Sequence, residues 1–356
     1  IMKLNLSPDE EDFQRAIIKF VDQAFPLAAR GNPSPADEAH WHQAISNEGW
    51  TAVEWPLEFG GPGWSPVQIY LWYRITLQAN CPLADYCGTQ LVGPLLQQFG
   101  GGSDYSQHLR GIIEHTHVWG NAVFFDASAT LVATGSSESF LLTGKTPCFS
   151  TSAKFDRALV LAETSGGYSL FLVDLNLAGV TRTQAKFAAD FFSLTLDQVR
   201  VSDLLGERDK GIDQLISLMK GPESVSMVVH LQVALSNLKK SVVLNGLQAS
   251  MEKKLSELEI EFKALEATGL RSILSDSAEK LPIITTRGHS LARRISDTFR
   301  DVKGYYALPD EVAVAGGNEP PLSAPDLDAG FRQLEYLPGR PQGFSEDLLA
   351  KTLLGL

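Results

Sequence analysis

The sequence predicts an α+β protein in which helices come first, a β-module follows, and helices return at the end. Apolar residues recur at the three- and four-residue spacing of helices up to about residue 110 and again from about residue 209. Between them lie short segments rich in β-branched and aromatic residues, separated by Gly, Ser and Asp. We therefore expect an N-terminal helical domain over 1–118, a central β-sandwich or barrel over 119–207, and a C-terminal helical bundle over 208–356.

Capping residues mark two of the N-terminal helices. Ser7 precedes Pro8, and Ser65 precedes Pro66, so each serine is a predicted N-cap with proline at the first helical position. Further helices are expected at 35–49, where Gly49 stops the pattern, and at 89–100. The buried face of the first helix is predicted at Phe13, Ile17, Phe20 and Val21.

Six segments in the middle of the chain have the composition and regular spacing of strands. They are residues 119–125, 139–144, 157–163, 168–175, 179–184 and 194–201. In the C-terminal third, residues 211–246 carry a broad apolar face. The helix after them places Leu255, Leu258, Phe262 and Leu265 at alternating spacings of three and four, a seam suited to a bundle or a subunit interface.

Composition excludes several classes of function. A formal net charge of −12 and a pI of about 5.1 argue against nucleic acid, which needs a basic surface. No signal peptide and no apolar run of the roughly 18 residues needed to cross a membrane are recognisable. Three cysteines without CxxC spacing indicate neither disulfides nor zinc, and a reducing cytoplasm is expected. The pairs His40/His42 and His115/His117 lack acid or cysteine partners at ligand spacing, so we expect no metal.

Residues 48–70 resemble the N-terminal signature of the acyl-CoA dehydrogenase family. That signature is a Gly-Trp followed by a Pro-Glu-x-x-Gly-Gly-x-Gly-x-Ser loop between the second and third helices. The matching residues here are Gly49, Trp50, Pro56, Glu58, Gly60, Gly61, Gly63 and Ser65, with Leu57 inserted. Glycines permit such a turn and Ser65 then caps the next helix.

Three further segments resemble the same family in the family's order. They are residues 142–164, similar to its Gly-x-Lys strand-turn, 196–219, similar to its exit from the β-domain, and 348–356, similar to its closing Ala-Lys-x-Leu-Leu-Gly-Leu. The resemblance implies a C-terminal four-helix bundle and a flavoprotein that oxidises acyl-CoA. In that reaction a carboxylate removes the α-proton and FAD takes the β-hydride.

The family's base positions are not carboxylates here. Counting back from the closing Ala-Lys, the usual glutamate falls on Gly343, and nearby Glu346 lies about one turn further into the helix. A minority of the family carries the base on the first long C-terminal helix, and Val225 stands there. Glu223, two residues earlier, is the first fallback base and Glu346 the second; a solvated helix-start acid is the alternative interpretation of each.

Several of the flavin contacts that the resemblance implies are missing from this sequence. The family's segment between the first two strands usually reads Glu-Pro-x-x-Gly-Ser-Asp; here only Asp126 resembles its acid, and the Gly-Ser-Asp is missing. The Arg-x-x-Phe-Gly whose arginine meets the flavin pyrophosphate has no counterpart, because residues 242–254 pass directly from one helix to the next. The retained cofactor-binding candidates are Ser150 and Thr151, which are placed to meet the flavin ring, and Gly316 and Gly317, which permit close backbone approach.

The resemblance and these departures favour one interpretation and leave two open. In the favoured one the chain is a subunit without its own base that partners a catalytic paralogue in a heterotetramer. The pair would dehydrogenate acyl-CoAs, including bulky ones such as steroid side-chain thioesters, with FAD shared between subunits. The second is an active dehydrogenase that uses a displaced carboxylate such as Glu223. The third is a homo-oligomer that binds acyl-CoA without turnover.

Overall fold

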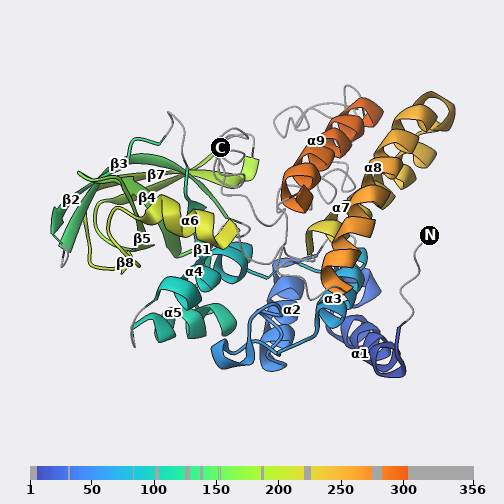
Figure 1. Cartoon of the computed structure of the whole chain (residues 1–356), viewed down its shortest axis with the longest axis horizontal. Coiled ribbons are helices and arrows are strands. Elements are labelled where there is room, and N and C mark those ends of the chain that lie inside the picture. Colours follow the sequence, from blue (N-terminus) through green and yellow to red (C-terminus); the bar gives the residue numbers. More distant parts are fainter. Residues whose placement is uncertain are drawn as a thin grey trace. The chain divides into compact units, whose positions relative to one another are not determined.

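The chain divides into two compact units, drawn in Figure 1. The computed structural model describes residues 6–30, 33–82, 84–100, 104–124, 129–136, 139–150, 152, 154–185, 188–219, 226–274 and 283–303. The first unit is built from residues 1–41, 64–82 and 223–338, and the second from 42–63, 83–222 and 339–356. Both units are therefore assembled from segments far apart in the sequence.

The first unit is helical in its described residues. Its helices are α1 (Pro8–Ala24), the first half of α2 (Pro35–Asn47), α3 (Pro66–Gln78), α7 (Ser226–Leu244), α8 (Gln248–Leu274) and α9 (Ile283–Lys303). The predicted caps are confirmed: Ser7 and Ser65 each accept from the backbone N–H three residues on, and Glu10 and Gln68 bond back to close capping boxes. Ile17 and Val21 of α1 are buried, as its apolar spacing predicts.

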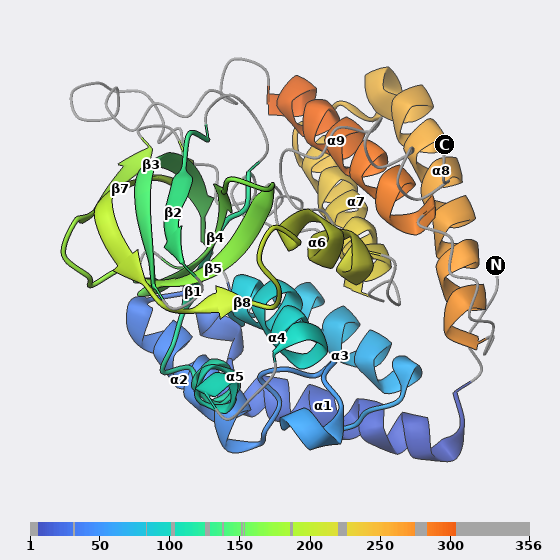
Figure 2. The same cartoon turned by 60° about the vertical axis from the view of Figure 1, so that its left-hand side comes forward.

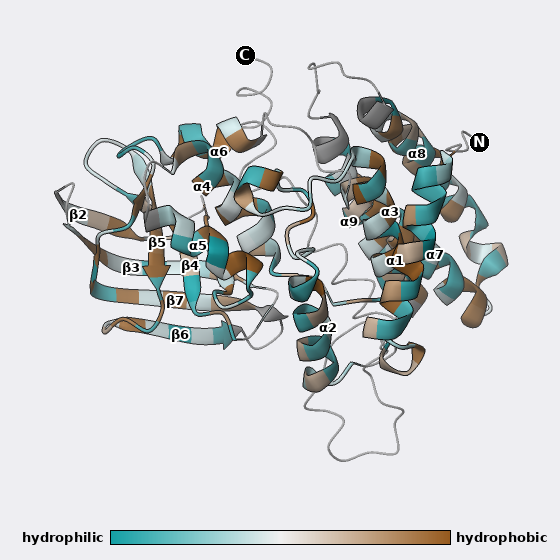
Figure 3. Cartoon of the chain, turned by 90° about the horizontal axis from the view of Figure 1, so that it is seen from below, coloured by the Kyte–Doolittle hydropathy of each residue, from teal (hydrophilic) through white to brown (hydrophobic). Residues whose placement is uncertain are grey.

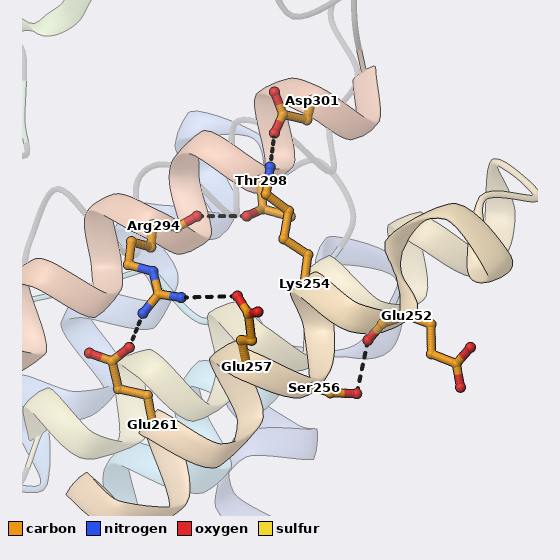
Figure 4. Close-up of polar contacts among 8 residues, drawn as sticks. All are labelled: Glu252, Lys254, Ser256, Glu257, Glu261, Arg294, Thr298 and Asp301. Atoms are coloured by element: carbon orange, nitrogen blue, oxygen red, sulfur yellow. Dashed lines mark hydrogen bonds and ion pairs between the residues drawn. The ribbon is translucent and has the colours of Figure 1, made fainter.

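Helices α7, α8 and α9 share one apolar core. The predicted seam of α8 faces this core: Leu258, Phe262 and Leu265 are buried, and Leu255 packs against the cluster while partly exposed. On the polar side, Arg294 of α9 pairs with Glu257 and Glu261 of α8, and Lys254 of α8 pairs with Asp301 of α9 (Figure 4). Such partly exposed pairs stabilise by about 1 kcal/mol or less, so burial of the seam carries the packing.

The second unit combines a sheet with short helices. Its helical elements are η2 (Leu57–Phe59), the π-helical turn η3 (Gly88–Val92), α4 (Gly93–Phe99), α5 (Asp104–Ile113) and α6 (Gly211–Met219). The strands are β1 (Trp119–Ala122), β2 (Val132–Ser136), β3 (Ser139–Phe149), β4 (Arg157–Glu163), β5 (Tyr168–Asp174), β6 (Val180–Ala185), β7 (Ala188–Val201) and β8 (Leu204–Leu205).

In the described residues these strands form one curled sheet of order β6-β7-β3-β1-β4-β5-β8 (Figure 2). β2 pairs with both β3 and β4, as β1 does, so the sheet bends round on itself. Hydrophobic and hydrophilic residues alternate along much of β7, which is typical of a strand with one buried face (Figure 3).

The two faces of β4 have different neighbours. Leu159 and Leu161 join the cluster that contains residues of α4, whereas Ala158, Val160 and Ala162 point into the curl of the sheet. A strand covered on both faces reads as a continuous apolar run, which is why 157–163 was predictable as a strand. The segments predicted as strands all contain a strand, whereas β2 and β8 were not predicted.

Candidate functional site

The structure describes one of the residues predicted to serve the reaction or its cofactor. Ser150 follows β3 in the second unit. The other predictions fall on residues outside the described ones: Thr151, Gly316 and Gly317 as cofactor contacts, Glu223 and Glu346 as fallback bases, Gly343 at the usual base position, and Asp126. Ser150 and the residues that contact it are therefore the part of the candidate site that the structure describes.

The Ser150 side chain is fully buried and its hydroxyl is engaged with backbone. Its Oγ–H donates to the carbonyl oxygen of Trp119 at 3.2 Å, and Oγ accepts from the backbone N–H of Ser152 at 3.3 Å. A hydroxyl has one hydrogen and two lone pairs. Both contacts lie within the chain and the side chain has no exposed surface, so the Trp119 peptide sets the direction of the hydroxyl.

Trp119 presents this carbonyl because it opens strand β1. The strand pairs in parallel with β4, where the N–H of Arg157 bonds to the carbonyl of Val118 at 3.1 Å. Successive residues of a strand turn their peptide groups to opposite neighbours, so Trp119 turns its N–H and C=O toward the β3 side. There the ladder pairs Asn121 with Phe149, and β3 ends at that residue. The backbone N–H and the carbonyl of Trp119 therefore both bond to side chains and not to another strand.

The partner of the Trp119 N–H is Asp85. Its Oδ2 accepts from that N–H at 2.9 Å, across a sequence separation of 34 residues. Asp85 also stands directly before a helical run that begins at Tyr86, and its carboxylate accepts from the N–H groups of Cys87 and Gly88. Those are the N2 and N3 positions that an N-cap aspartate normally serves. Asp85 therefore caps the helix, and its carboxylate also accepts from the Trp119 N–H in place of a backbone carbonyl of a neighbouring strand.

A tryptophan supports the turn that Asp85 caps. Trp55 is buried, and its indole Nε1–H donates to the carbonyl of Thr89 within η3 at 2.7 Å. A Cβ on Gly93 would lie 1.9 Å from Cζ2 of the same indole, so only glycine lets the helix approach so closely. The π-helical turn between Asp85 and α4 is thus fixed from two sides, and π-turns are frequent at functional sites.

Burial perturbs the Asp85 carboxyl. The side chain is 2% exposed, and burial raises its pKa from 3.8 to about 7, opposed by the bonds from Gly88, Trp119 and Cys87. The charge of Asp156 nearby raises it further. Oδ1 has no hydrogen-bond partner among the described residues. The arrangement therefore suits a carboxyl that keeps a proton on Oδ1 up to near-neutral pH.

We expect Asp85 to make stability fall as the pH rises. Below about pH 4 the carboxyl is protonated in both folded and unfolded chains, between pH 4 and 7 only the folded chain keeps the proton, and above pH 7 the folded chain holds a buried charge. Urea unfolding at pH 5 and pH 8 measures this. The free energy of unfolding of Asp85→Asn, compared with that of wild type, should be more favourable at pH 8 than at pH 5 by on the order of 2 kcal/mol, because asparagine does not titrate. An unchanged difference would show that Asp85 titrates normally.

The other titratable groups in the described part of the chain make no metal cluster. The rings of His42 and His115 stack at 4.5 Å, and burial lowers the pKa of His42 to about 4. His117 lies instead beside His108, with ring centroids 5.8 Å apart. Among the described residues, no group of three His, Cys, Asp or Glu side chains is placed to hold a metal ion. All three cysteines are free and buried, so Cys148 is packed rather than exposed.

The connection between α7 and α8 bears on flavin binding. Helix α7 ends at Leu244 and α8 begins at Gln248, so the direct passage predicted from the sequence is confirmed. Two large hydrophobic side chains are exposed beside this turn, Val243 at 57% and Leu244 at 76%, where the resemblance would put an arginine. Among the described residues, Ser150 has no exposed surface through which to meet a flavin ring, and this turn offers no arginine for a pyrophosphate.

Comparison with solved structures identifies the fold of this chain. Over its full length the chain resembles a chain of the Tcur3481-Tcur3483 steroid ACAD, with a TM-score of 0.74, 16% identity and 99% of that chain covered. It also resembles a chain of the ChsE4-ChsE5 complex from Mycobacterium tuberculosis, with a TM-score of 0.70, 16% identity and 100% and 99% of the two chains covered. The chain has the acyl-CoA dehydrogenase fold.

Sequence comparison points the same way over a shorter stretch. The acyl-CoA dehydrogenase IpdE1 of Mycolicibacterium smegmatis is 30% identical over 99 residues, which are 26% of this chain and 25% of that protein. The match thus spans about a quarter of the curated relative's length. No family profile matches the sequence. The resemblance to acyl-CoA dehydrogenases is confirmed by these relatives, and the α+β class by the fold. The described helices include none long and apolar enough to cross a membrane.

Sequence reasoning missed Asp85 and used Trp119 only as a strand residue. A signal for Asp85 was present, because an aspartate before the segment Tyr86–Val92 is a possible N-cap. Its second role was not readable, since the bond to Trp119 joins residues that are distant in sequence.

Proposed function

We propose that this chain is a subunit of an FAD-dependent acyl-CoA dehydrogenase that supplies structure and part of a flavin site but no catalytic base. Its partner would be a homologous catalytic subunit, and the substrate a bulky acyl-CoA such as a steroid side-chain thioester. FAD, when bound, supplies the hydride acceptor. A cytoplasmic location stays a prediction.

The observation that carries this proposal is the short turn between α7 and α8. The resemblance implies an arginine for the flavin pyrophosphate between these helices, and residues 245–247 alone connect them. A dinucleotide cofactor that lacks its pyrophosphate contacts here needs them from another chain. Two sequence features support the same conclusion: Gly343 at the usual base position and Val225 at the alternative one. Two solved structures of the same fold, the Tcur3481-Tcur3483 steroid ACAD and the ChsE4-ChsE5 complex, each contain two named proteins.

Co-purification tests the partnership. The chain carries an affinity tag and is co-expressed with a candidate catalytic acyl-CoA dehydrogenase from the same organism, which carries none. We expect both chains to elute together in a fixed ratio, with bound FAD and turnover of a steroid side-chain CoA thioester. An unrelated acyl-CoA dehydrogenase, co-expressed in the same way, is the control. Elution of the tagged chain alone, or equal capture of the control, contradicts the proposal.

The second candidate function is an active enzyme that uses Glu223, which precedes the first residue of α7 by a short stretch. Its test is Glu223→Gln, which removes the basicity and keeps the shape. We expect the co-purified complex to keep its turnover within about twofold, because the partner supplies the base. A loss of several orders of magnitude, with the complex and its flavin intact, would make Glu223 the base and replace the proposed function.

A further inference from the structure

We propose that the stacked rings of His42 and His115 form an acid-released latch, which holds residues 42–63 against the end of α5 at neutral pH and releases them when one ring binds a proton. Residues 42–63, α5 and the turn after it all belong to the second unit. The segment carries Trp55, whose indole donates to the Thr89 carbonyl, so its release would also loosen η3. The latch is a property of the fold and does not depend on the proposed function.

The two imidazole rings meet face to face. Their centroids lie 4.5 Å apart and their planes are 18° from parallel. His42 comes from the second half of α2, and His115 from the turn that follows α5. Nδ1 of each ring is buried and has no hydrogen-bond partner among the described residues. Such a contact suits two neutral rings, because neither of them then needs a partner for a charge.

The end of α5 is also held to this segment by contacts that do not titrate. The carbonyl oxygen of Ile113 accepts from Ser46 Oγ at 3.2 Å and from Thr51 Oγ1 at 2.9 Å. The Ile113 side chain lies so close to Gly60 that a Cβ there would be 2.5 Å from its Cδ1. Residues 42–63 thus meet the end of α5 at several points, and the histidine pair is the point at which a proton can act.

A positive charge on either ring would be poorly accommodated. A protonated imidazole donates from both nitrogens, so Nδ1 would become a buried donor without an acceptor. Burial, followed by the neighbouring His115 ring, lowers the pKa of His42 to about 4, and burial lowers the pKa of His115 as well. The charged groups nearest along the two elements are Glu38 on α2 and Arg110 and Glu114 at the end of α5. All three are exposed, and neither acid pairs with the rings.

The direction of the pH effect follows from the two pKa values of His42. In the released segment the ring takes its proton near the ordinary pKa of 6.5, and in the closed form only near pH 4. The contact is therefore at full strength above pH 6.5 and is lost as the pH falls toward 4. Between pH 8 and pH 5 the ratio of closed to released chains should fall by about 30-fold for His42 alone. Asp85 acts in the opposite direction, because it makes the second unit more stable at low pH.

Hydrogen–deuterium exchange of the full chain at pH 8 and pH 5 tests the proposal. Exchange rates of the amides in residues 42–63 are measured by mass spectrometry and divided by the intrinsic rates at each pH, which gives their protection. The variants are His42→Gln, which cannot titrate, and His40→Gln, a matched control because His40 is exposed on the same helix. Amides of β4 and β5 report on the rest of the unit. The histidine C2–H resonances of the wild type are titrated by NMR, and that of His42 is assigned by its loss in His42→Gln.

We expect the protection of residues 42–63, relative to β4 and β5, to fall about 30-fold from pH 8 to pH 5 in the wild type and in His40→Gln, and to stay constant in His42→Gln. The His42 resonance should titrate near pH 4. Equal protection at both pH values in the wild type, or a fall that persists in His42→Gln, overturns the latch. If His42→Gln lacks protection at both pH values, the NMR titration of the wild type decides: a midpoint near pH 4 supports the latch, and one near 6.5 removes it.

Discussion

Asp85→Ala is expected to cost the second unit on the order of 3–5 kcal/mol at pH 5. The substitution removes a helix N-cap, which is worth about 1 kcal/mol by itself. The cap is part of a larger loss, because three buried N–H groups, the Cys87 and Gly88 groups of the cap and that of Trp119, are left without an acceptor, at about 1–3 kcal/mol each before relaxation. The measurement is the free energy of unfolding from urea titration. At pH 5 the carboxyl is protonated, so the loss is not offset by removing a buried charge.

Two control variants are compared with Asp85→Ala. Asp85→Asn keeps an oxygen acceptor and should lie within about 1 kcal/mol of wild type at pH 5, because asparagine caps helices as well as aspartate does. Asp156→Ala removes the acceptor for one partly exposed N–H and should cost about 1 kcal/mol. An Asp85→Ala variant no less stable than Asp156→Ala would mean that water or another group replaces Asp85, and the account of the β1 start would be wrong.

Gly61→Ala is expected to have the second large effect, about 3 kcal/mol or more. A Cβ at Gly61 would lie 1.9 Å from the carbonyl oxygen and 2.5 Å from the carbonyl carbon of Trp55, and backbone atoms cannot rotate away. Displacing Trp55 would also pull its indole from the Thr89 carbonyl and from Gly93, and so loosen the turn that Asp85 caps. Unfolding in urea gives the size of the effect.

The matched control is Gly49→Ala, in the same motif. Gly49 has φ +72° and no atom within 4 Å of its would-be Cβ, so the variant meets backbone strain without a clash. It should cost roughly 1 kcal/mol, the price of a left-handed conformation for an ordinary residue. Equal losses in the two variants would show that the glycines of this motif serve the turn alone and not the packing of Trp55.

Local chemistry was readable from the sequence wherever its partners are close in the chain. Ser7 and Ser65 cap their helices through residues three positions on, and the α8 seam repeats within one helix. The strand β2, in contrast, is Val-Ala-Thr-Gly-Ser and carries little strand signal of its own. Its pairing with β3 and β4 holds it in place, which is a property of the assembled sheet.

The candidate site was readable in part for the same reason. Ser150 was identified by its resemblance to a family motif, whereas its hydrogen-bond partner Trp119 lies 31 residues away. Asp85 is still further from Ser150 in sequence and reaches it through that partner. Periodicity and spacing report neighbours along one helix or strand, and they carry no information about which distant peptide group a buried carboxylate will meet. The remaining predicted site residues, including Gly343 and Glu223, lie outside the described residues and stay predictions.

The most direct test of the proposed function is the visible absorption spectrum and acyl-CoA turnover of the chain purified alone. The protein is incubated with excess FAD, freed of unbound flavin by gel filtration, and assayed with a steroid side-chain CoA thioester and with butyryl-CoA. We predict a colourless, inactive protein that acquires flavin and turnover only together with its catalytic partner. A full flavin complement with turnover of either substrate by the chain alone would contradict the account.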